Sequence, residues 1–227
     1  YYSQIESENK IAFSSSIKSL ISLGLPNNRT LDLFAFQIYM EKGYVPGYRT
    51  LISGIKKLYP GQVLQFDIKT AKILRSFNTH KKIGQTNDFS TDEFREHVSS
   101  AVKKCLMGRR QVGLFLSGGL DSSMILHELA QQHNNPKTFT TRFELGKKGT
   151  VAAEKKRVNS DADAAKKLSE HYGTTHTELT ITKDDFFNAI EPCIEALEEP
   201  RYNRSSPAYY LLNKEMASQG TVVTLAG

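Results

Sequence analysis

The chain has 227 residues, of which 39% are hydrophobic and 24% are charged, a balance that suits a globular protein large enough to bury a sizeable core. No stretch approaches the roughly 18 consecutive apolar residues of a membrane-spanning helix, and the sequence does not open with a basic segment followed by a hydrophobic one. These features argue against a membrane protein, a secreted protein and a disordered chain. We expect one or two domains and a cytoplasmic location.

The chain is basic, because 30 Lys and Arg outweigh 24 Asp and Glu and give a formal charge of +6. This excess is compatible with nucleic-acid binding, or with a solvated surface that also attracts an anionic nucleotide. No nucleic-acid-binding motif occurs, so we favour the second interpretation and expect neither nucleic acid nor membrane as a partner. Part of the excess lies in Gly146–Val158, which we interpret as a loop that either covers bound substrates or is a flexible insertion.

Only two cysteines occur, Cys105 and Cys193. They are far apart and each lies in a helix-like pattern, so the sequence suggests neither a disulfide scaffold nor a metal knuckle. We expect both thiols to be buried or inert.

Short β-like runs and Gly/Pro turns fill the sequence up to about Phe77, beginning with Lys10–Ser14. The runs Gln62–Ile68 and Lys72–Phe77 predict a hairpin, because the first alternates apolar and polar residues and Lys69–Ala71 can form the turn. Earlier in the chain, Leu31–Met40 carries apolar residues at helical spacing, with Thr30 or Asp32 near its start.

A domain boundary is predicted near residues 78–90, where the sequence becomes polar and aperiodic. Ser90 followed by Glu93 is a capping-box pattern, which predicts a helix that continues to about Met107. We therefore divide the chain into residues 1–78, a linker at 79–90, and residues 91–227.

After the linker, segments with strand and helix character alternate. This rhythm predicts an α/β domain with a parallel sheet and helices on both faces. The segments, in order, are Val112–Leu116, Ser122–His133, Lys137–Phe143, Ser160–Tyr172, His176–Ile181, Lys183–Leu197, Pro207–Ser218 and Thr221–Leu225.

A strand, a glycine pair and a helix follow one another in residues 112–126, so the intervening loop should lie where open α/β sheets bind ligands. Gly118 and Gly119 would let backbone N–H groups approach an anion, and the helix that begins near Ser122 would point its positive end at the same place. Hydroxyl donors would come from Ser117, Ser122 and Ser123.

Asp121 is a carboxylate beside a proposed polyphosphate site, so we expect a divalent cation between the two, and magnesium is the natural candidate. The loop is neither a Walker A motif nor the GxGxxG of dinucleotide folds. The string Ser117-Gly-Gly-Leu-Asp-Ser-Ser123 instead resembles the pyrophosphate loop of the N-type ATP pyrophosphatases. That resemblance implies an adenine nucleotide alpha-hydrolase-like fold, ATP and Mg²⁺ as cofactors, and contacts from Leu120 as well as the residues above.

Over nearly its whole length the chain resembles glutamine-hydrolysing asparagine synthetases. Before the linker, the resemblance to the end of their Ntn-type glutaminase domain rests on Tyr1-Tyr2, Ile11–Ser14, Ile17–Leu20, Gly43–Gly47, Thr50–Ile55 and Lys57–Gly61. After the linker, the resemblance to their synthetase domain rests on Thr138–Thr141, Ser160–Ala165, Gly173–His176, Glu198–Pro200 and Val222–Gly227.

The resemblance implies roles for several residues outside the loop. Adenosine would contact Leu116, Thr141, Ala226 and Gly227. Arg204 matches a family arginine that faces the pyrophosphate, although a surface arginine near a helix start explains it equally well. Glu198 and Glu199 are interpreted first as a solvated acidic turn, and otherwise as magnesium ligands or caps.

Parts of the family pattern are absent. The N-terminal glutaminase cysteine and the acidic signature after the final glycine are missing, so we expect this chain to be a fragment that is inactive alone. Ser16 stands where the family usually has Glu, which makes altered coupling between the two half-sites an expectation.

The implied function of the intact enzyme is an ATP-dependent ligation. Aspartate is activated to β-aspartyl-AMP, and ammonia from glutamine converts it to asparagine, AMP and pyrophosphate. Partners would be these small molecules, and a homodimer is compatible with the sequence. Alternatives are the same fold with another acceptor, as in a β-lactam synthetase, a peptide cyclase or a sugar-acid amidotransferase, or a non-catalytic nucleotide-binding protein.

Overall fold

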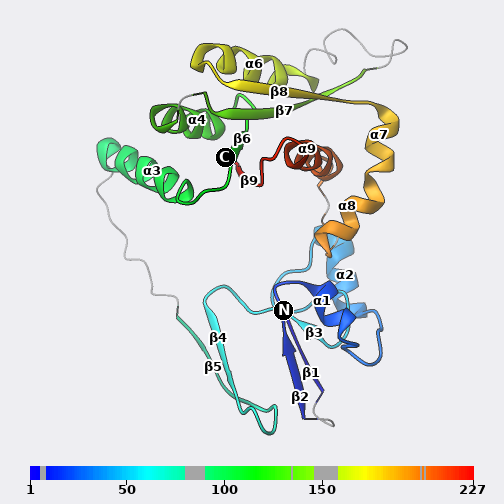
Figure 1. Ribbon diagram of the computed structural model, residues 1–227. Helices are drawn as coiled ribbons and strands as arrows, with labels where there is room; N and C mark the ends of the chain where they lie inside the picture. The colour runs from blue at the N-terminus through cyan, green and yellow to red at the C-terminus, as the bar shows by residue number, and fades with distance from the viewer. Residues whose placement is uncertain (6–8, 80–89, 134, 146–157, 200, 202) are drawn as a thin grey trace. The chain divides into compact units, whose positions relative to one another are not determined.

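The computed structural model describes residues 1–5, 9–79, 90–133, 135–145, 158–199, 201 and 203–227 (Figure 1). The chain divides into two compact units, each described here separately. Unit 1 comprises Tyr1–Gln85 and Ile194–Arg204, and unit 2 comprises Thr86–Cys193 and Ser205–Gly227. The predicted loop Gly146–Val158 lies outside the described residues except for Val158, and so does most of the predicted linker.

Unit 2 is built on a four-stranded parallel sheet with the order β8-β7-β6-β9 (Figure 1). Its strands are β6 (Val112–Phe115), β7 (Lys137–Phe143), β8 (Thr175–Ile181) and β9 (Val223–Leu225). The chain runs outward from β6 through β7 to β8 and then returns to the other side of β6 with β9. The predicted α/β class with a parallel sheet is therefore confirmed.

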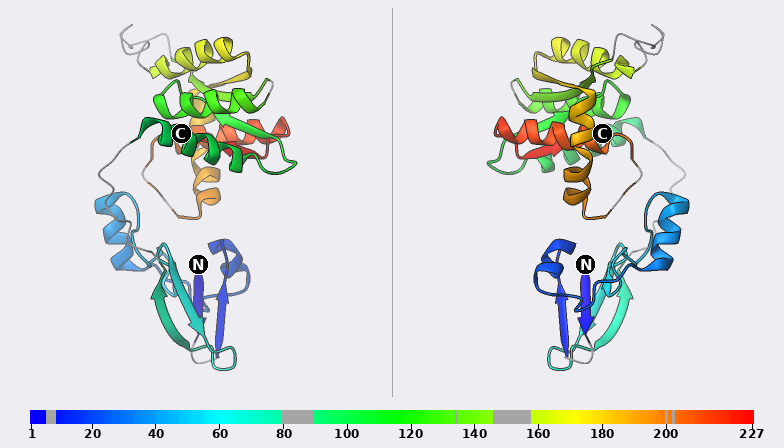
Figure 2. Two further views of the ribbon diagram at one scale, coloured as in Figure 1. Left: turned by 90° about the vertical axis from the view of Figure 1, so that its left-hand side faces the viewer. Right: turned by 90° about the vertical axis from the view of Figure 1, so that its right-hand side faces the viewer.

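Helices cover both faces of this sheet, as the two views of Figure 2 show. One layer holds α3 (Thr91–Cys105), α4 (Leu120–Gln132) and α6 (Ser160–Tyr172), and the other holds α7 (Lys183–Asn188) and α9 (Ser206–Ser218). Because side chains alternate along β6, Leu114 packs under α4 and α6, while Phe115 contacts the cluster formed with α9. Both faces are thus buried, as parallel sheets require.

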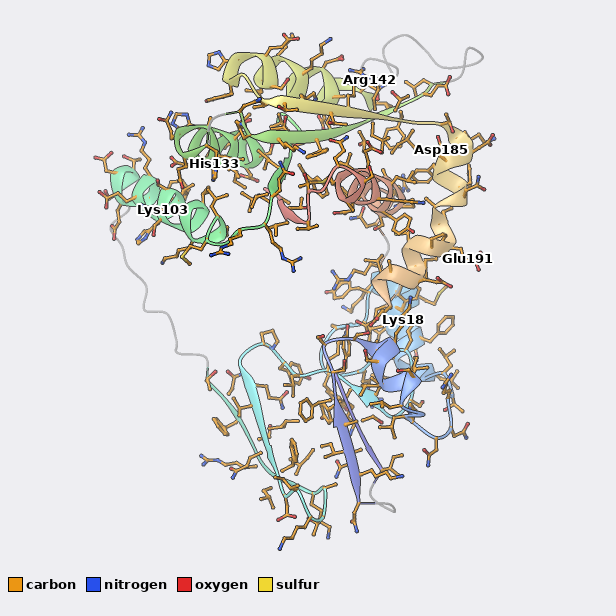
Figure 3. All side chains as sticks on the ribbon, viewed as in Figure 1. Lys18, Lys103, His133, Arg142, Asp185 and Glu191 are labelled. Carbon is orange, nitrogen blue, oxygen red and sulfur yellow. The ribbon has the colours of Figure 1, made fainter. Side chains whose placement is uncertain are left out.

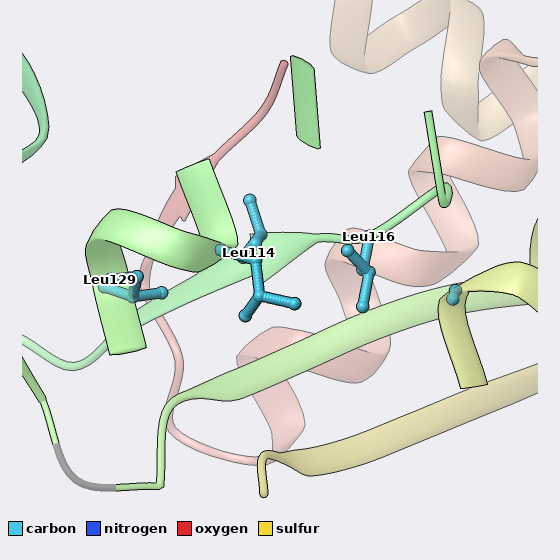
Figure 4. Close-up of a cluster of buried hydrophobic side chains, with 5 residues drawn as sticks. Leu114, Leu116 and Leu129 are labelled. Carbon is cyan, nitrogen blue, oxygen red and sulfur yellow. The ribbon is translucent and has the colours of Figure 1, made fainter. Parts of the chain in front are cut away.

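The larger apolar cluster of unit 2 lies between β6, α4 and α6 (Figure 4). Leu114, Leu126 and Ala165 are fully buried there, and Leu116 and Leu129 are each 2% exposed. Leu126 and Leu129 are three residues apart, so they share one face of α4. This face directs α4 onto the sheet and fixes the loop that precedes it.

Unit 1 has smaller sheets. β1 (Tyr2–Ile5) pairs antiparallel with β2 (Lys10–Phe13) and β3 (Ile55–Lys56), and β4 (Gln62–Phe66) pairs antiparallel with β5 (Ile73–Asn78). The β4–β5 pair confirms the predicted hairpin. Two helices complete the unit: α1 (Ile17–Ser22) and α2 (Leu33–Lys42), whose N-cap is Asp32 rather than Thr30.

The segment Ile194–Arg204 contributes two acidic anchors to unit 1. Glu198 accepts hydrogen bonds from the Ser16 hydroxyl and from the Ile17 backbone N–H, both at 2.5 Å, and so caps α1. Glu199 is 9% exposed, and its carboxylate lies 3.1 Å from the Lys57 ammonium. Burial, with Glu199 nearby, raises the pKa of the Tyr1 hydroxyl that donates to this carboxylate. The interpretation of a solvated acidic turn is wrong, because both carboxylates are engaged.

Three further expectations need correction. The predicted helix Lys183–Leu197 is two helices, α7 and α8 (Ile190–Leu197), because the ring of Pro192 clashes with the carbonyl four residues earlier, at Asn188. Cys105 is exposed rather than buried, whereas Cys193 is buried and its burial raises the pKa of the thiol. The helix after the phosphate loop starts at Leu120 instead of Ser122. No described helix has both the length and the apolar character needed to span a membrane.

Candidate functional site

A cavity of about 500 Å³ lies at the carboxyl ends of β6, β7 and β9 in unit 2. It occupies the place where the strand order reverses, since β7 lies on one side of β6 and β9 on the other. Open α/β sheets bind ligands at such a switch point, because the loops that leave the two neighbouring strands diverge there. The cavity is lined by Phe115, Leu116, Ser117, Ser122, Phe139, Thr140, Thr141, Phe143, Val158, Asp161, Ser205, Ala208, Tyr209, Leu212, Ala226 and Gly227.

The loop between β6 and α4 is held close to α6. Gly118 has a φ of +74°, in the left-handed region that favours glycine, and a Cβ at this position would collide with the Cβ of Ala164. A side chain would therefore strain the backbone and push the loop away from α6. The glycine brings the backbone of this loop against α6, beside the cavity.

The first turn of α4 offers backbone donors. Its N-cap residue is Gly119, which has no side chain to cap the helix, and within the described residues the N–H groups of Leu120, Asp121 and Ser122 have no hydrogen-bond partner. Uncapped N–H groups and the positive end of the helix dipole together favour an anion. This arrangement matches the predicted phosphate loop.

Hydroxyl groups connect the two ends of this loop. The Ser122 hydroxyl donates to the Gly119 carbonyl at 3.2 Å and lies 3.0 Å from the Ser117 hydroxyl, which in turn accepts from the Gly119 N–H at 3.3 Å. Ser123 donates to the same carbonyl at 2.6 Å. Ser117 and Ser122 line the cavity and Ser123 does not, so two of the three predicted hydroxyl donors are placed to meet a ligand.

Gly227 lies against the beginning of α4. A Cβ at Gly227 would be 2.5 Å from the Ser122 nitrogen and 2.6 Å from the Asp121 carbonyl carbon. Only a residue without a side chain allows the segment after β9 to approach the phosphate loop this closely. Ala226 and Gly227 thus form a cavity wall next to the loop.

The structure gathers most of the predicted site residues. Leu116, Ser117, Ser122, Thr141, Ala226 and Gly227 line the one cavity, and Gly118, Gly119, Leu120 and Asp121 form the adjoining loop and first helical turn. The Asp121 side chain is exposed, and that of Leu120 is 76% exposed. Arg204 falls in unit 1, so its role opposite the pyrophosphate stays a prediction.

Sequence reasoning missed several lining residues. Phe115 and Tyr209 stack with ring centroids 5.6 Å apart and an interplanar angle of 28°, which makes one wall of the cavity aromatic. Asp161, in the first turn of α6, is the carboxylate among the lining residues. Its position in the first turn of the helix after β7 could have indicated it, whereas the approach of Tyr209 depends on how α9 packs.

The residues present suit a magnesium ion that is also held by the phosphates of a bound nucleotide, rather than one held by protein side chains alone. Among the described residues, no group of three or more His, Cys, Asp and Glu could hold a metal ion. Mg²⁺ is commonly bound through one or two carboxylates plus substrate phosphates and water. Asp121 in the first turn of α4 is the carboxylate that such a site would use.

An ion-pair network lies on the α6 side of β7, where Arg142 is labelled in Figure 3. The Arg142 guanidinium donates to both oxygens of Glu178, at 2.7 and 2.9 Å, and to Asp163 at 2.7 Å. These bonds raise the pKa of Arg142 and hold the pKa of Asp163 below its usual range. The network therefore fixes α6 relative to β7 and β8.

A family model described as asparagine synthase matches residues 93–227, which is more than half of the chain. The chain belongs to the asparagine synthase family. This match contains all of the cavity-lining residues and confirms the resemblance that the motifs indicated.

Individual proteins of this family are similar to a larger part of the chain than the family model matches. Asparagine synthetase [glutamine-hydrolyzing] 1 of Bacillus subtilis is 28% identical over 232 residues, covering 100% of this chain and 34% of that protein. The protein of the same name from Saccharomyces cerevisiae is 30% identical over 195 residues, covering 74% of this chain and 33% of that protein. This chain therefore spans about a third of the length of these relatives.

Among solved structures, similarity is weaker. The NMN synthetase from Francisella tularensis gives a TM-score of 0.40 at 14% identity, covering 60% of this chain and 54% of that chain. The NH3-dependent NAD synthetase from Campylobacter jejuni gives a TM-score of 0.38 at 14% identity, covering 60% and 56%. Likeness at this level does not establish a shared architecture.

Proposed function

We propose that this chain is part of a glutamine-dependent asparagine synthetase and that unit 2 binds ATP and activates the side-chain carboxylate of aspartate. In the first step a carboxylate oxygen bonds to the α-phosphorus of ATP, the bond to the β-phosphate breaks, and pyrophosphate leaves. In the second step ammonia attacks the acyl carbon of β-aspartyl-AMP, loses a proton and displaces AMP. The products are asparagine, AMP and pyrophosphate.

One observation carries the proposal. The cavity at the switch point of a parallel sheet is bounded by a glycine loop and by an uncapped helix start, and Gly227 packs directly on that helix start. Backbone donors in this arrangement suit the phosphates of a nucleotide. The aromatic and apolar lining around Phe115 and Tyr209 suits a base.

Different residues of the cavity would contact different parts of the nucleotide. Ser117, Gly118, Gly119 and Ser122 would hold the pyrophosphate portion, and Leu120 would contribute its backbone N–H. Adenosine would contact Leu116, Thr141, Ala226 and Gly227. Catalysis by these groups is positioning and stabilisation of charge rather than covalent chemistry.

Two charged residues complete the proposed site. Mg²⁺, when bound, would neutralise phosphate charge, and Asp121 would hold it. Arg204 would offset the charge that develops on the departing pyrophosphate.

The domain assignment is also a proposal. Residues 1–78 would be the end of a glutaminase domain that supplies ammonia, residues 79–90 a linker, and residues 91–227 the first part of the synthetase domain. The start of the family match at residue 93 and the boundary between the two units at Gln85 and Thr86 support this division. Residues 194–204 are grouped with unit 1 in the structure, although the family model that covers them begins at residue 93.

The proposal is tested by exchange of labelled pyrophosphate into ATP in the full-length protein, with aspartate and Mg²⁺ present. We expect Asp121→Ala to abolish exchange, because the metal loses its protein ligand. Asp184→Ala removes an equal charge from the exposed first turn of α7 and should leave exchange intact. Unchanged exchange in Asp121→Ala would remove this residue from the mechanism, and absence of exchange in the wild-type enzyme would contradict the proposed activity.

The acceptor needs its own assay. We expect chromatography to detect asparagine when the full-length enzyme is given aspartate, ammonia and Mg·ATP. If the enzyme binds ATP but forms neither asparagine nor AMP from this mixture, it is instead a relative that acts on another acceptor.

A further inference from the structure

Asp161 lines the cavity, and none of the described residues pairs with its carboxylate. It lies in the first turn of α6 and is the carboxylate among the residues that line the cavity. Within the part of the chain that the structure describes, its side chain makes no hydrogen bond or ion pair. A carboxylate beside a polyphosphate site is repelled by the ligand unless it meets hydrogen-bond donors or a cation.

Asp163, two residues further along α6, is a natural contrast. Its carboxylate accepts a 2.7 Å hydrogen bond from Arg142, which is also paired with Glu178. Asp163 is absent from the cavity lining and has a structural partner. Of the two carboxylates in this turn, Asp161 is therefore the one left for a ligand.

The position of Asp161 along α6 indicates which part of a nucleotide it would meet. Ala164, three residues later, is the residue that a Cβ on Gly118 would strike, so it marks where α6 touches the phosphate loop. Three residues of α-helix correspond to a rise of about 4.5 Å. Asp161 is thus about one helical turn from the loop, and in a nucleotide the ribose is the group next to the α-phosphate.

We propose that Asp161 accepts hydrogen bonds from the ribose hydroxyls of the bound nucleotide and so selects ribonucleotides. This inference rests on the proposed function, because it requires the phosphates to occupy the loop. A carboxylate has two acceptor oxygens, which match the two vicinal hydroxyls, and acidic residues recognise ribose in this way in other nucleotide-binding folds. Hydrogen bonds to a charged acceptor are strong enough to give a roughly 10- to 100-fold preference.

Calorimetric titration with AMP and with 2′,3′-dideoxy-AMP in the presence of EDTA tests the inference, because these ligands carry the sugar without a need for metal. We expect the wild-type protein to bind AMP roughly 10- to 100-fold more tightly than the dideoxy analogue. Asp161→Asn should reduce that ratio towards one. Asp163→Asn removes the same charge from the same helix turn outside the cavity, and it should keep the wild-type ratio.

The ratio of the two affinities reports on recognition of the ribose alone. AMP and its dideoxy analogue carry the same phosphate, so a folding defect or a change in protein charge would weaken the binding of both ligands equally. If Asp161→Asn keeps the full ratio while wild-type AMP binding is normal, the inference is overturned and the proposed nucleotide site stands. An Asp161→Asn defect that appears only with Mg·ATP would assign the residue to the metal instead and also overturn it. Failure of the wild-type protein to bind AMP or ATP would overturn the proposed function, and the inference with it.

Discussion

The two units of this chain are stabilised in different ways. Unit 2 surrounds its parallel sheet with two apolar clusters, one under α4 and α6 and one under α9. Unit 1 has one small cluster around Ile17, Leu20 and Ile55, and many of its large apolar side chains are exposed. Unit 1 is also stabilised by polar contacts with its segment Ile194–Arg204, between residues that are 142 to 182 positions apart in the chain.

This difference has a consequence for function. The cavity in unit 2 is bounded by residues of that unit alone, so its shape depends on the apolar layers that orient β6 and α4. The conformation of unit 1 depends in addition on Glu198 and Glu199, and Glu198 adopts a left-handed φ of 60° that its contacts must stabilise. Stability should therefore respond to apolar truncation in unit 2 and to loss of charge in unit 1.

The largest effect is expected from Leu114→Ala in unit 2. Leu114 is fully buried beneath α4 and α6, so truncation leaves a cavity and should cost about 3–5 kcal/mol of unfolding free energy. Chemical denaturation monitored by circular dichroism measures this. Ile68→Ala in unit 1 is the control, since Ile68 is 89% exposed and should change stability by less than about 0.5 kcal/mol. Equal effects of the two substitutions would contradict the layered core.

An intermediate effect is expected from Lys57→Met in unit 1. The Lys57 and Glu199 side chains are 21% and 11% exposed, so loss of the ammonium leaves a largely buried carboxylate with the Tyr1 hydroxyl as its remaining partner. We expect a cost of about 2 kcal/mol. Hydrogen exchange should accelerate in residues 194–199 and in unit 1.

Lys56→Met is the matched control for this experiment, because Lys56 is the adjacent, exposed lysine. It should leave exchange rates unchanged. If Lys57→Met accelerates exchange throughout unit 2 instead, the division of stability between the units is wrong.

The smallest effect is expected from titration of His176 in unit 2. The imidazole is half-buried, and burial lowers its pKa, opposed by Glu178 and assisted by Lys166. The unfolded chain then binds the proton more readily, so stability from this residue is intact above about pH 6.5 and declines as the pH falls from there towards the folded-state pKa. His176→Gln should flatten the decline in unfolding free energy between pH 7 and 5. An unaltered pH profile would show that other groups cause it.

Local patterns predicted those helices and strands that are long enough to show a hydrophobic pattern of their own. β7 and α6 have the predicted bounds, because a buried run and an amphipathic repeat each carry their own signal. The break at Asn188 was missed because apolar periodicity alone does not register the clash of a proline ring, although Pro192 was a local signal for it. The short elements β1, β3 and α1 were not predicted, because two to six residues hold too little periodicity.

Some of the functional residues could be recognised from their neighbours in the sequence, and others could not. The loop Ser117–Ser122 was recognisable because glycines, hydroxyls and a strand-to-helix transition are consecutive in the chain. Asp161, Tyr209 and Glu199 gave no comparable signal. Glu199 was predicted to be solvated because its partner Lys57 is 142 residues away, and only the ion pair of Asp163 with Arg142 distinguishes that carboxylate from Asp161.

The sequence alone was thus sufficient to predict the α/β class and to find the loop that we propose binds phosphate, because both follow from periodicity and from contacts between near neighbours along the chain. Tertiary packing decided that Asp161 is the carboxylate in the cavity lining, that Glu199 is buried beside Lys57, and that Gly227 lies against the start of α4. These outcomes depend on contacts between distant segments. Such contacts form only when several elements bury their apolar faces together, so no local pattern encodes them.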